Sequence, residues 1–152
     1  MSGFFTVNFF LKLLTALLGT LGFAVLFKVR VRHLPFAGVC GILTWVLYYS
    51  VVFFGGSLFL AAFAASAVAT TFAECCARTR RAPAPVFLVP GTIPIVPGSD
   101  LYYTMCHLLS GNFEDCTYYL VRALLIGIGI GGGIVTVSVI ASLVTGKKAL
   151  KS

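Results

Sequence analysis

The sequence predicts an all-α integral membrane protein with about five transmembrane helices, the fourth of them broken by a Pro/Gly motif. Hydrophobic residues make up 59% of the 152 residues and charged residues 10%, and the mean hydropathy is +1.03. Soluble domains average about 25% charged residues. Apolar runs long enough to cross a bilayer alternate with short connections that hold most of the cations. We therefore treat residues 1–152 as a single polytopic membrane domain surrounded by lipid.

The first apolar run covers residues 4–27 and follows no basic leader. Polar and small residues recur in it at helical spacing, which predicts one lipid-avoiding face for helix packing. The members of that face are Asn8, Lys12, Thr15, Gly19 and Gly22. A lysine inside the membrane is costly unless it snorkels to the interface or finds a partner. Lys12 is therefore a candidate coupling group or charge partner, with snorkelling as the alternative.

The second and third runs cover residues 35–54 and 58–77. Alanine, serine and threonine dominate the third run, which predicts a helix buried among others. Glu74 precedes Arg78 by four residues, the favourable spacing for a helical ion pair. A helix-end pair is the simplest reading of Glu74, and a role in charge coupling or binding is the alternative.

The fourth run, residues 86–109, contains three prolines, with glycine beside two of them. Proline removes a backbone donor and clashes with the preceding turn, so an unbroken helix is not expected. In lipid the freed backbone must be satisfied by protein or by a water-filled cavity. An interrupted apolar segment therefore predicts a transport site, with a packing kink as the alternative. The residues of the motif are Pro90, Gly91, Pro94, Pro97 and Gly98.

We expect the break deep in the bilayer, with Ser99 or Asp100 capping a second half-helix that runs outward through Tyr102 and Tyr103. The amides at that N-terminus would attract a substrate carboxylate, and carbonyls freed by the prolines would line its path. An ionised, unpaired Asp100 would cost about 2.5–3.5 kcal/mol at this depth. Helix capping and proton coupling are both open roles for it, and pairing with a cation such as Lys12 is a further alternative.

The fifth run covers residues 118–145 and contains the sequence GIGIGGG. No strand precedes these glycines, and no acidic residue follows at the distance a dinucleotide site requires. Their spacing is that of small-xxx-small packing pairs, so we interpret them as a helix contact surface. The pairs are Gly127 with Gly131 and Gly129 with Gly133.

The distribution of charged residues predicts the orientation of the chain in the membrane. Basic clusters follow the first and third runs and end the chain, whereas Glu114 and Asp115 lie in the connection before the fifth run. The positive-inside rule then predicts an N-out, C-in, multi-pass protein of the plasma (cytoplasmic) membrane. Nine of the eleven Lys and Arg residues are explained in this way, leaving Lys12 and Arg122. The net charge of +7 is therefore no argument for nucleic-acid binding.

No motif supports catalysis. The five cysteines lack paired metal spacing, and we expect only Cys116 to be well exposed on the outside. No hydrolase elbow, zinc-binding HExxH or phosphate loop occurs. We predict no enzyme, no metal and no cofactor.

The sequence PGTIPIVPG followed by DLYYTM resembles the threonine/serine exporter family, specifically its small YjjB-like subunit, which corresponds to the second domain of the fused exporters. The preceding FAECCARTRRAPAPVFLVPG and the glycine-rich last run extend the resemblance over essentially the whole chain. It carries onto the motif prolines and glycines and onto Tyr102. Asp100 departs from the small or apolar residue expected there.

The resemblance implies one subunit of a secondary exporter of small amino acids (threonine, serine) or of small dicarboxylates such as succinate. It also implies a larger partner subunit, which these residues do not contain. The competing interpretation is a non-transporting scaffold or assembly subunit whose small-residue faces do the work. Formation of homo-oligomers is open in both cases.

Overall fold

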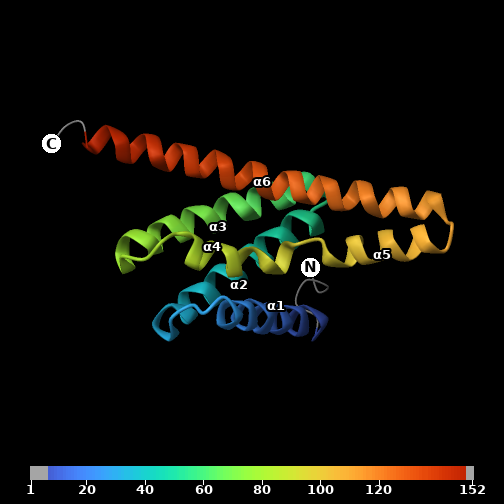
Figure 1. Cartoon of the computed structure of the whole chain (residues 1–152), viewed down its shortest axis with the longest axis horizontal. Helices are drawn as coiled ribbons and strands as arrows, with labels where there is room; N and C mark the ends of the chain where they lie inside the picture. The colour runs from blue at the N-terminus through green and yellow to red at the C-terminus, as the bar shows by residue number, and fades with distance from the viewer. Residues whose placement is uncertain (1–6, 150–152) are drawn as a thin grey trace.

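The computed structural model describes residues 7–149, and it describes side-chain surroundings for residues 9–143. Residues 4–6 of the first predicted run and Lys151 lie outside the described residues, as do the side chains of Asn8, Lys147 and Lys148. All regular elements in this range are helical (Figure 1). In chain order they are α1 (Val7–Leu26), η1 (Val31–His33), α2 (Leu34–Phe53), α3 (Leu58–Arg80), α4 (Pro85–Thr92), η2 (Ile93–Ile95), α5 (Gly98–Leu109) and α6 (Phe113–Ala149).

Four of the described helices, α1, α2, α3 and α6, have the length and apolar content to cross a membrane. The all-helical membrane class predicted from the sequence is therefore confirmed. The fourth predicted run is instead a shorter apolar helix, residues 85–95, followed by α5. The count of five spans and the N-out, C-in orientation remain predictions.

The broken segment interrupts its helix at Val96 and Pro97. Upstream of the break, the α4 backbone tightens into the 3₁₀ turn η2. The Ile93 N–H donates to the Pro90 carbonyl, and the Val96 N–H donates to the Ile93 carbonyl. These 3₁₀ bonds give donors to two carbonyls that lose an α-helical donor at Pro94 and Pro97. These two carbonyls therefore have donors within the segment, and a substrate path lined by carbonyls of the break remains a prediction.

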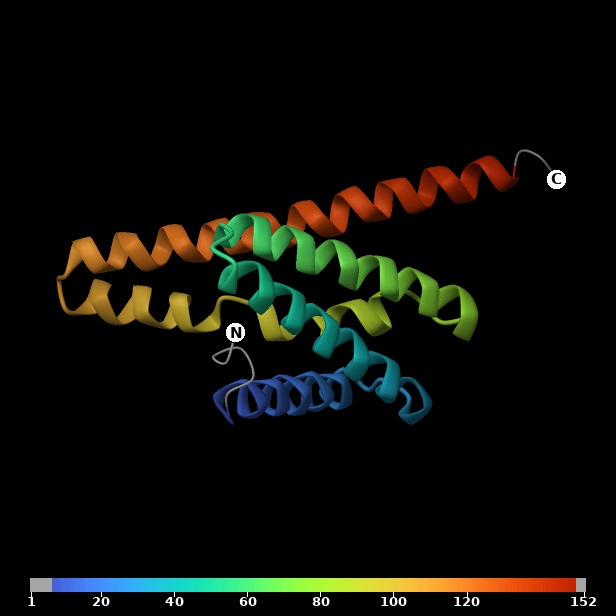
Figure 2. The same ribbon diagram turned by 180° about the vertical axis from the view of Figure 1, so that it is seen from behind.

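Helix α2 is at the centre of the bundle, with α1, α3 and α4 packed around it. The 3₁₀ turn η2 lies beside Trp45, close to the middle of α2, and the depth of the break in the bilayer remains a prediction. Beyond it, α5 makes its extensive contacts with α6 alone among the described helices. Both views show α5 and the first part of α6 projecting as a hairpin past the ends of α1–α3 (Figures 1 and 2).

Helix α6 has 37 residues and is about 55 Å long, well beyond the roughly 30 Å of a bilayer core. Its second part runs alongside α3 in the same direction (Figure 1). A Cβ placed on Gly129 would lie 2.7 Å from the Phe59 carbonyl oxygen, and one on Gly133 would lie 2.5 Å from that of Phe63. Only glycine permits such a close backbone approach at these two positions. A Cβ on Gly127 or Gly131 would meet nothing within 4 Å.

Candidate functional site

Lys12 and Pro94 line the same hollow, an open groove of about 290 Å³ between α1, α2 and η2. The Thr15 hydroxyl donates to the Lys12 carbonyl at 2.9 Å. Trp45 of α2 also lines the groove and stacks on Tyr49 with ring centroids 5.2 Å apart. The structure thus brings together two residues that the sequence marked separately. The full lining is Lys12, Thr15, Ala16, Gly19, Trp45, Ile93 and Pro94.

The groove has the chemistry to hold one end of a small anion. Lysine presents three donors and a full positive charge, and the rest of the lining is mostly apolar. No acidic side chain lines the groove. It can therefore satisfy a carboxylate but offers no charged partner for an ammonium group.

Helix α5 begins at Gly98, with Pro97 in the N-cap position and no side-chain cap. The prediction that Ser99 or Asp100 caps this helix is wrong, because both residues already lie within its first turn. Pro97 occupies the cap position, and its fixed φ (−78°) suits the residue that leads into a helix. The Asp100 carboxylate still lies near the positive end of the α5 dipole.

Asp100 is buried and lies next to Arg122 of α6, with 3.4 Å between Asp100 Oδ1 and Arg122 Nε. The expected pairing of Asp100 with Lys12 is therefore wrong. The contact is an ion pair without hydrogen-bond geometry. Arg122 Nη1 donates to the Tyr118 hydroxyl at 3.1 Å, and the guanidinium lies 5.5 Å from the Tyr118 ring centroid. A role for Asp100 in proton coupling remains a proposal.

The same hairpin aligns two further pairs. The Tyr103 and Tyr119 rings are 5.2 Å apart, and His107 Nδ1 lies 3.8 Å from Asp115 Oδ2. In each pair, and in Asp100–Arg122, the two partners are separated from Gly111 by the same number of residues along the chain. Gly111 is the positive-φ residue of the turn. Such symmetry is what an antiparallel helix hairpin imposes. Sequence reasoning missed Arg122, Tyr118 and Tyr119, although counting outward from Gly111 would have paired Arg122 with Asp100 and Tyr119 with Tyr103.

The remaining predicted site residues divide into buried and exposed groups. Pro90 and Gly91 are buried, and a Cβ on Gly91 would collide with the Cys40 side chain of α2. Gly98, Ser99 and Tyr102 are exposed. The first group holds α4 against the bundle, and the second lies on the surface outside the Lys12–Pro94 groove.

Glu74 lies 3.8 Å from Arg78, so the helical ion pair predicted from their spacing is confirmed. Both residues also border a hollow of about 310 Å³ between α3 and α6.

The cysteines differ from expectation in one respect. Cys116 is buried, whereas Cys75 and Cys106 are exposed. The prediction that Cys116 is the well exposed one is wrong, because its side chain lies on the covered face of α6. Within the described residues, no group of three or more His, Cys, Asp or Glu is placed to hold a metal ion.

Residues 12–140 match the family model described as "Threonine/Serine exporter, ThrE". The match includes the Lys12–Pro94 groove, the broken segment and the glycine contact between α3 and α6. No curated protein and no solved structure matches the chain.

Proposed function

Because this chain belongs to the threonine/serine exporter family, we propose that it is one subunit of a secondary exporter that acts with a larger partner subunit. The family and the four membrane-capable helices make it a multi-pass membrane protein of the exporter type. Our proposal adds threonine, serine or a small dicarboxylate as substrate, and the plasma membrane as location. It also includes five spans in an N-out, C-in arrangement.

The observation that carries the proposal is the Lys12–Pro94 groove. A lysine shares this groove with two residues of the 3₁₀ turn, and interrupted helices of this kind are typical of substrate sites in transporters. We assign the substrate carboxylate to the Lys12 ammonium. The groove is open and offers a cation for the substrate carboxylate but no anion for its ammonium group. This supports a site that the partner subunit completes.

A scaffold role is the second candidate. The open face around Gly127 and Gly131 supports it, because small residues let another helix approach closely. In that case the partner would bind this face, and Lys12 would have no part in transport.

The test is efflux from cells that lack their own exporter and express this chain with or without the neighbouring large-subunit gene. The cells are loaded together with labelled threonine, serine and succinate. We expect efflux only when both chains are present, and the label that leaves identifies the substrate class. Efflux from this chain alone would contradict the two-subunit proposal.

Variants at Lys12 separate the transport and scaffold roles. Lys12→Met should reduce efflux at least tenfold, whereas Lys12→Arg should retain most of it. Arg78→Gln removes an exposed cation outside the groove and is the matched control. Equal amounts of each variant in the membrane fraction show that insertion is unaffected. Full efflux by Lys12→Met with both chains present would favour the scaffold role.

A further inference from the structure

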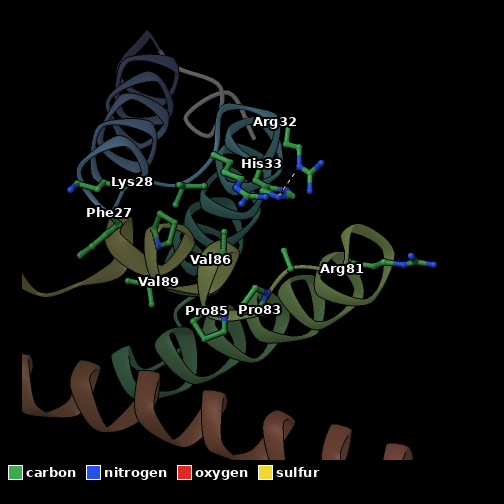
Figure 3. A pocket seen from close by; sticks show the side chains of 13 residues that line it. Phe27, Lys28, Arg32, His33, Arg81, Pro83, Pro85, Val86 and Val89 are labelled. Atoms are coloured by element: carbon green, nitrogen blue, oxygen red, sulfur yellow. Dashed lines mark hydrogen bonds between the residues drawn. The ribbon is translucent and has the colours of Figure 1, made fainter.

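Two adjoining hollows lie at the end of the bundle where the α1–α2 and α3–α4 connections meet (Figure 3). The larger measures about 630 Å³ and the smaller about 300 Å³, and they share Arg32, His33 and Arg81. We call them together the basic pocket. It is separate from the Lys12–Pro94 groove, with which it shares no lining residue.

Within the part of the chain that the structure describes, the cations of the basic pocket have no anionic partner. Lys28, Arg30 and Arg32 come from the first connection, and Arg80 and Arg81 from the end of α3. The chain has four acidic residues, and none of them lines either hollow. Among the described residues, no acidic side chain forms an ion pair with these five cations. Uncompensated positive charge gathered around a concave surface attracts an anion.

His33 adds a specific donor to this charge. It is 4% exposed, lines both hollows and packs edge-on against Phe87. The Arg32 Nε–H donates to His33 Nε2 at 3.3 Å, so in the neutral ring the proton is on Nδ1. That N–H is buried and has no partner in the structure. Because Nδ1 itself is covered in this side-chain position, the His33 ring must rotate before this N–H can donate to an anionic oxygen in the pocket.

The two hollows differ in polarity. The smaller is lined by polar residues alone, Arg32, His33, Thr79, Arg80 and Arg81. The larger adds an apolar wall that includes Phe27, Val86 and Val89. Figure 3 shows Lys28 beside Phe27 at one end of this wall and Arg81 at the other end, with its side chain extending outward. Phe27 and Val89 are exposed on this wall. The pocket therefore suits a molecule with an anionic head and an apolar body.

We propose that the basic pocket binds an anionic phospholipid, with its phosphate among Arg32, His33 and Arg81 and an acyl chain along Phe27, Val86 and Val89. Basic pockets between membrane helices recognise lipid head groups in this way. A zwitterionic amino acid would leave its ammonium among cations, and a dicarboxylate has no apolar body for the wall. The inference does not depend on export.

The backbone at the two rims is consistent with a binding role. Lys28 (φ +56°) and Arg81 (φ +50°) are the two non-glycine residues with positive φ among those described. Arg81 directly follows α3, and Lys28 lies two residues after the end of α1. Glycine is the usual residue with positive φ at the end of a helix. The chain instead places a cation at both positions, and such strained residues gather at ligand sites.

The test uses the full chain in nanodiscs, with phosphatidylglycerol or phosphatidylcholine as the lipid, and native mass spectrometry of the chain released from mixtures of the two. We expect selective retention of phosphatidylglycerol. Arg81→Gln should weaken the apparent affinity about fivefold, and adding Arg32→Gln should weaken it about fivefold more. Arg78 lies in the last turn of α3, outside the pocket, and the Arg78→Gln variant should bind the lipid like the wild type.

Arg81→Gly removes the charge at a position with positive φ, where glycine is not strained. If the helix content of this variant is unchanged, a loss of lipid binding is due to the lost charge and not to misfolding. Equal retention of the two lipids would overturn the proposal, as would an equal loss in Arg78→Gln and Arg81→Gln. Displacement of the lipid by millimolar inorganic phosphate, threonine or succinate would also overturn it, because the pocket would then hold a soluble anion. Retained export by Arg81→Gly together with lost lipid would show that the lipid site and the transport site are independent.

Discussion

The carboxylate of Asp100 lies 3.4 Å from the guanidinium of Arg122. This ion pair connects the first turn of α5, directly after the break, to α6. The two residues lie equally far from Gly111, so the pair fixes the register of the hairpin at the end farthest from its turn. A pair in this position gives the interrupted chain a defined place to resume its helix.

Breaking this pair should destabilise the protein. Arg122→Gln leaves the buried Asp100 without a cation, and we expect a loss of about 1–2 kcal/mol because Arg122 is partly exposed. Asp100→Asn combined with Arg122→Gln should recover part of that loss, since no charge then stays buried alone. Thermal unfolding in detergent measures these two variants and Asp100→Asn alone. A loss in the double variant as large as the sum of the two single losses would show that the pair is not coupled.

The glycines of α6 should respond according to the face on which they lie. Gly129→Ala and Gly133→Ala place a methyl group against the α3 backbone and should each cost about 1–3 kcal/mol. Gly127→Ala and Gly131→Ala meet open space and should stabilise the helix by up to about 1 kcal/mol. Unfolding of the four single variants tests this order. Equal effects on the two faces would contradict the described contact between α3 and α6.

Removing the two prolines at the break should abolish export. Pro94→Ala with Pro97→Ala restores two backbone donors, so an α-helix can continue through the η2 turn. The wall facing Lys12 would then be lost. Efflux is the measurement, with membrane insertion and expression as controls. Normal export by this double variant would remove the break from the mechanism.

The orientation can be tested with cysteines placed in two connections. In a chain whose native cysteines are replaced by alanine or serine, Asn112→Cys lies in the hairpin turn and Ala82→Cys in the basic connection. A membrane-impermeant maleimide added to intact cells should label the first and not the second. The opposite labelling pattern would reverse the N-out, C-in assignment.

Features set by residues within one or two helical turns, such as a helix break or an ion pair on one helix, could be predicted from the sequence. Three prolines placed the helix interruption near Val96, because proline acts on its own turn. The four-residue spacing of Glu74 and Arg78 predicted their ion pair for the same reason. Features that depend on how separate helices align could not be read in this way. The partner of Asp100 follows from counting outward from Gly111 only once the hairpin is known to turn there, and the buried state of His33 depends on the meeting of two distant connections.

The continuous α6 helix has a mechanical consequence. One part of it is held against α3 by backbone contact at Gly129 and Gly133, and the other part carries α5 and the end of the broken segment. Both parts belong to one continuous helix that no proline interrupts. We therefore expect a change in the α3 packing at Gly129 and Gly133 to displace the projecting hairpin and the end of the broken segment along with α6.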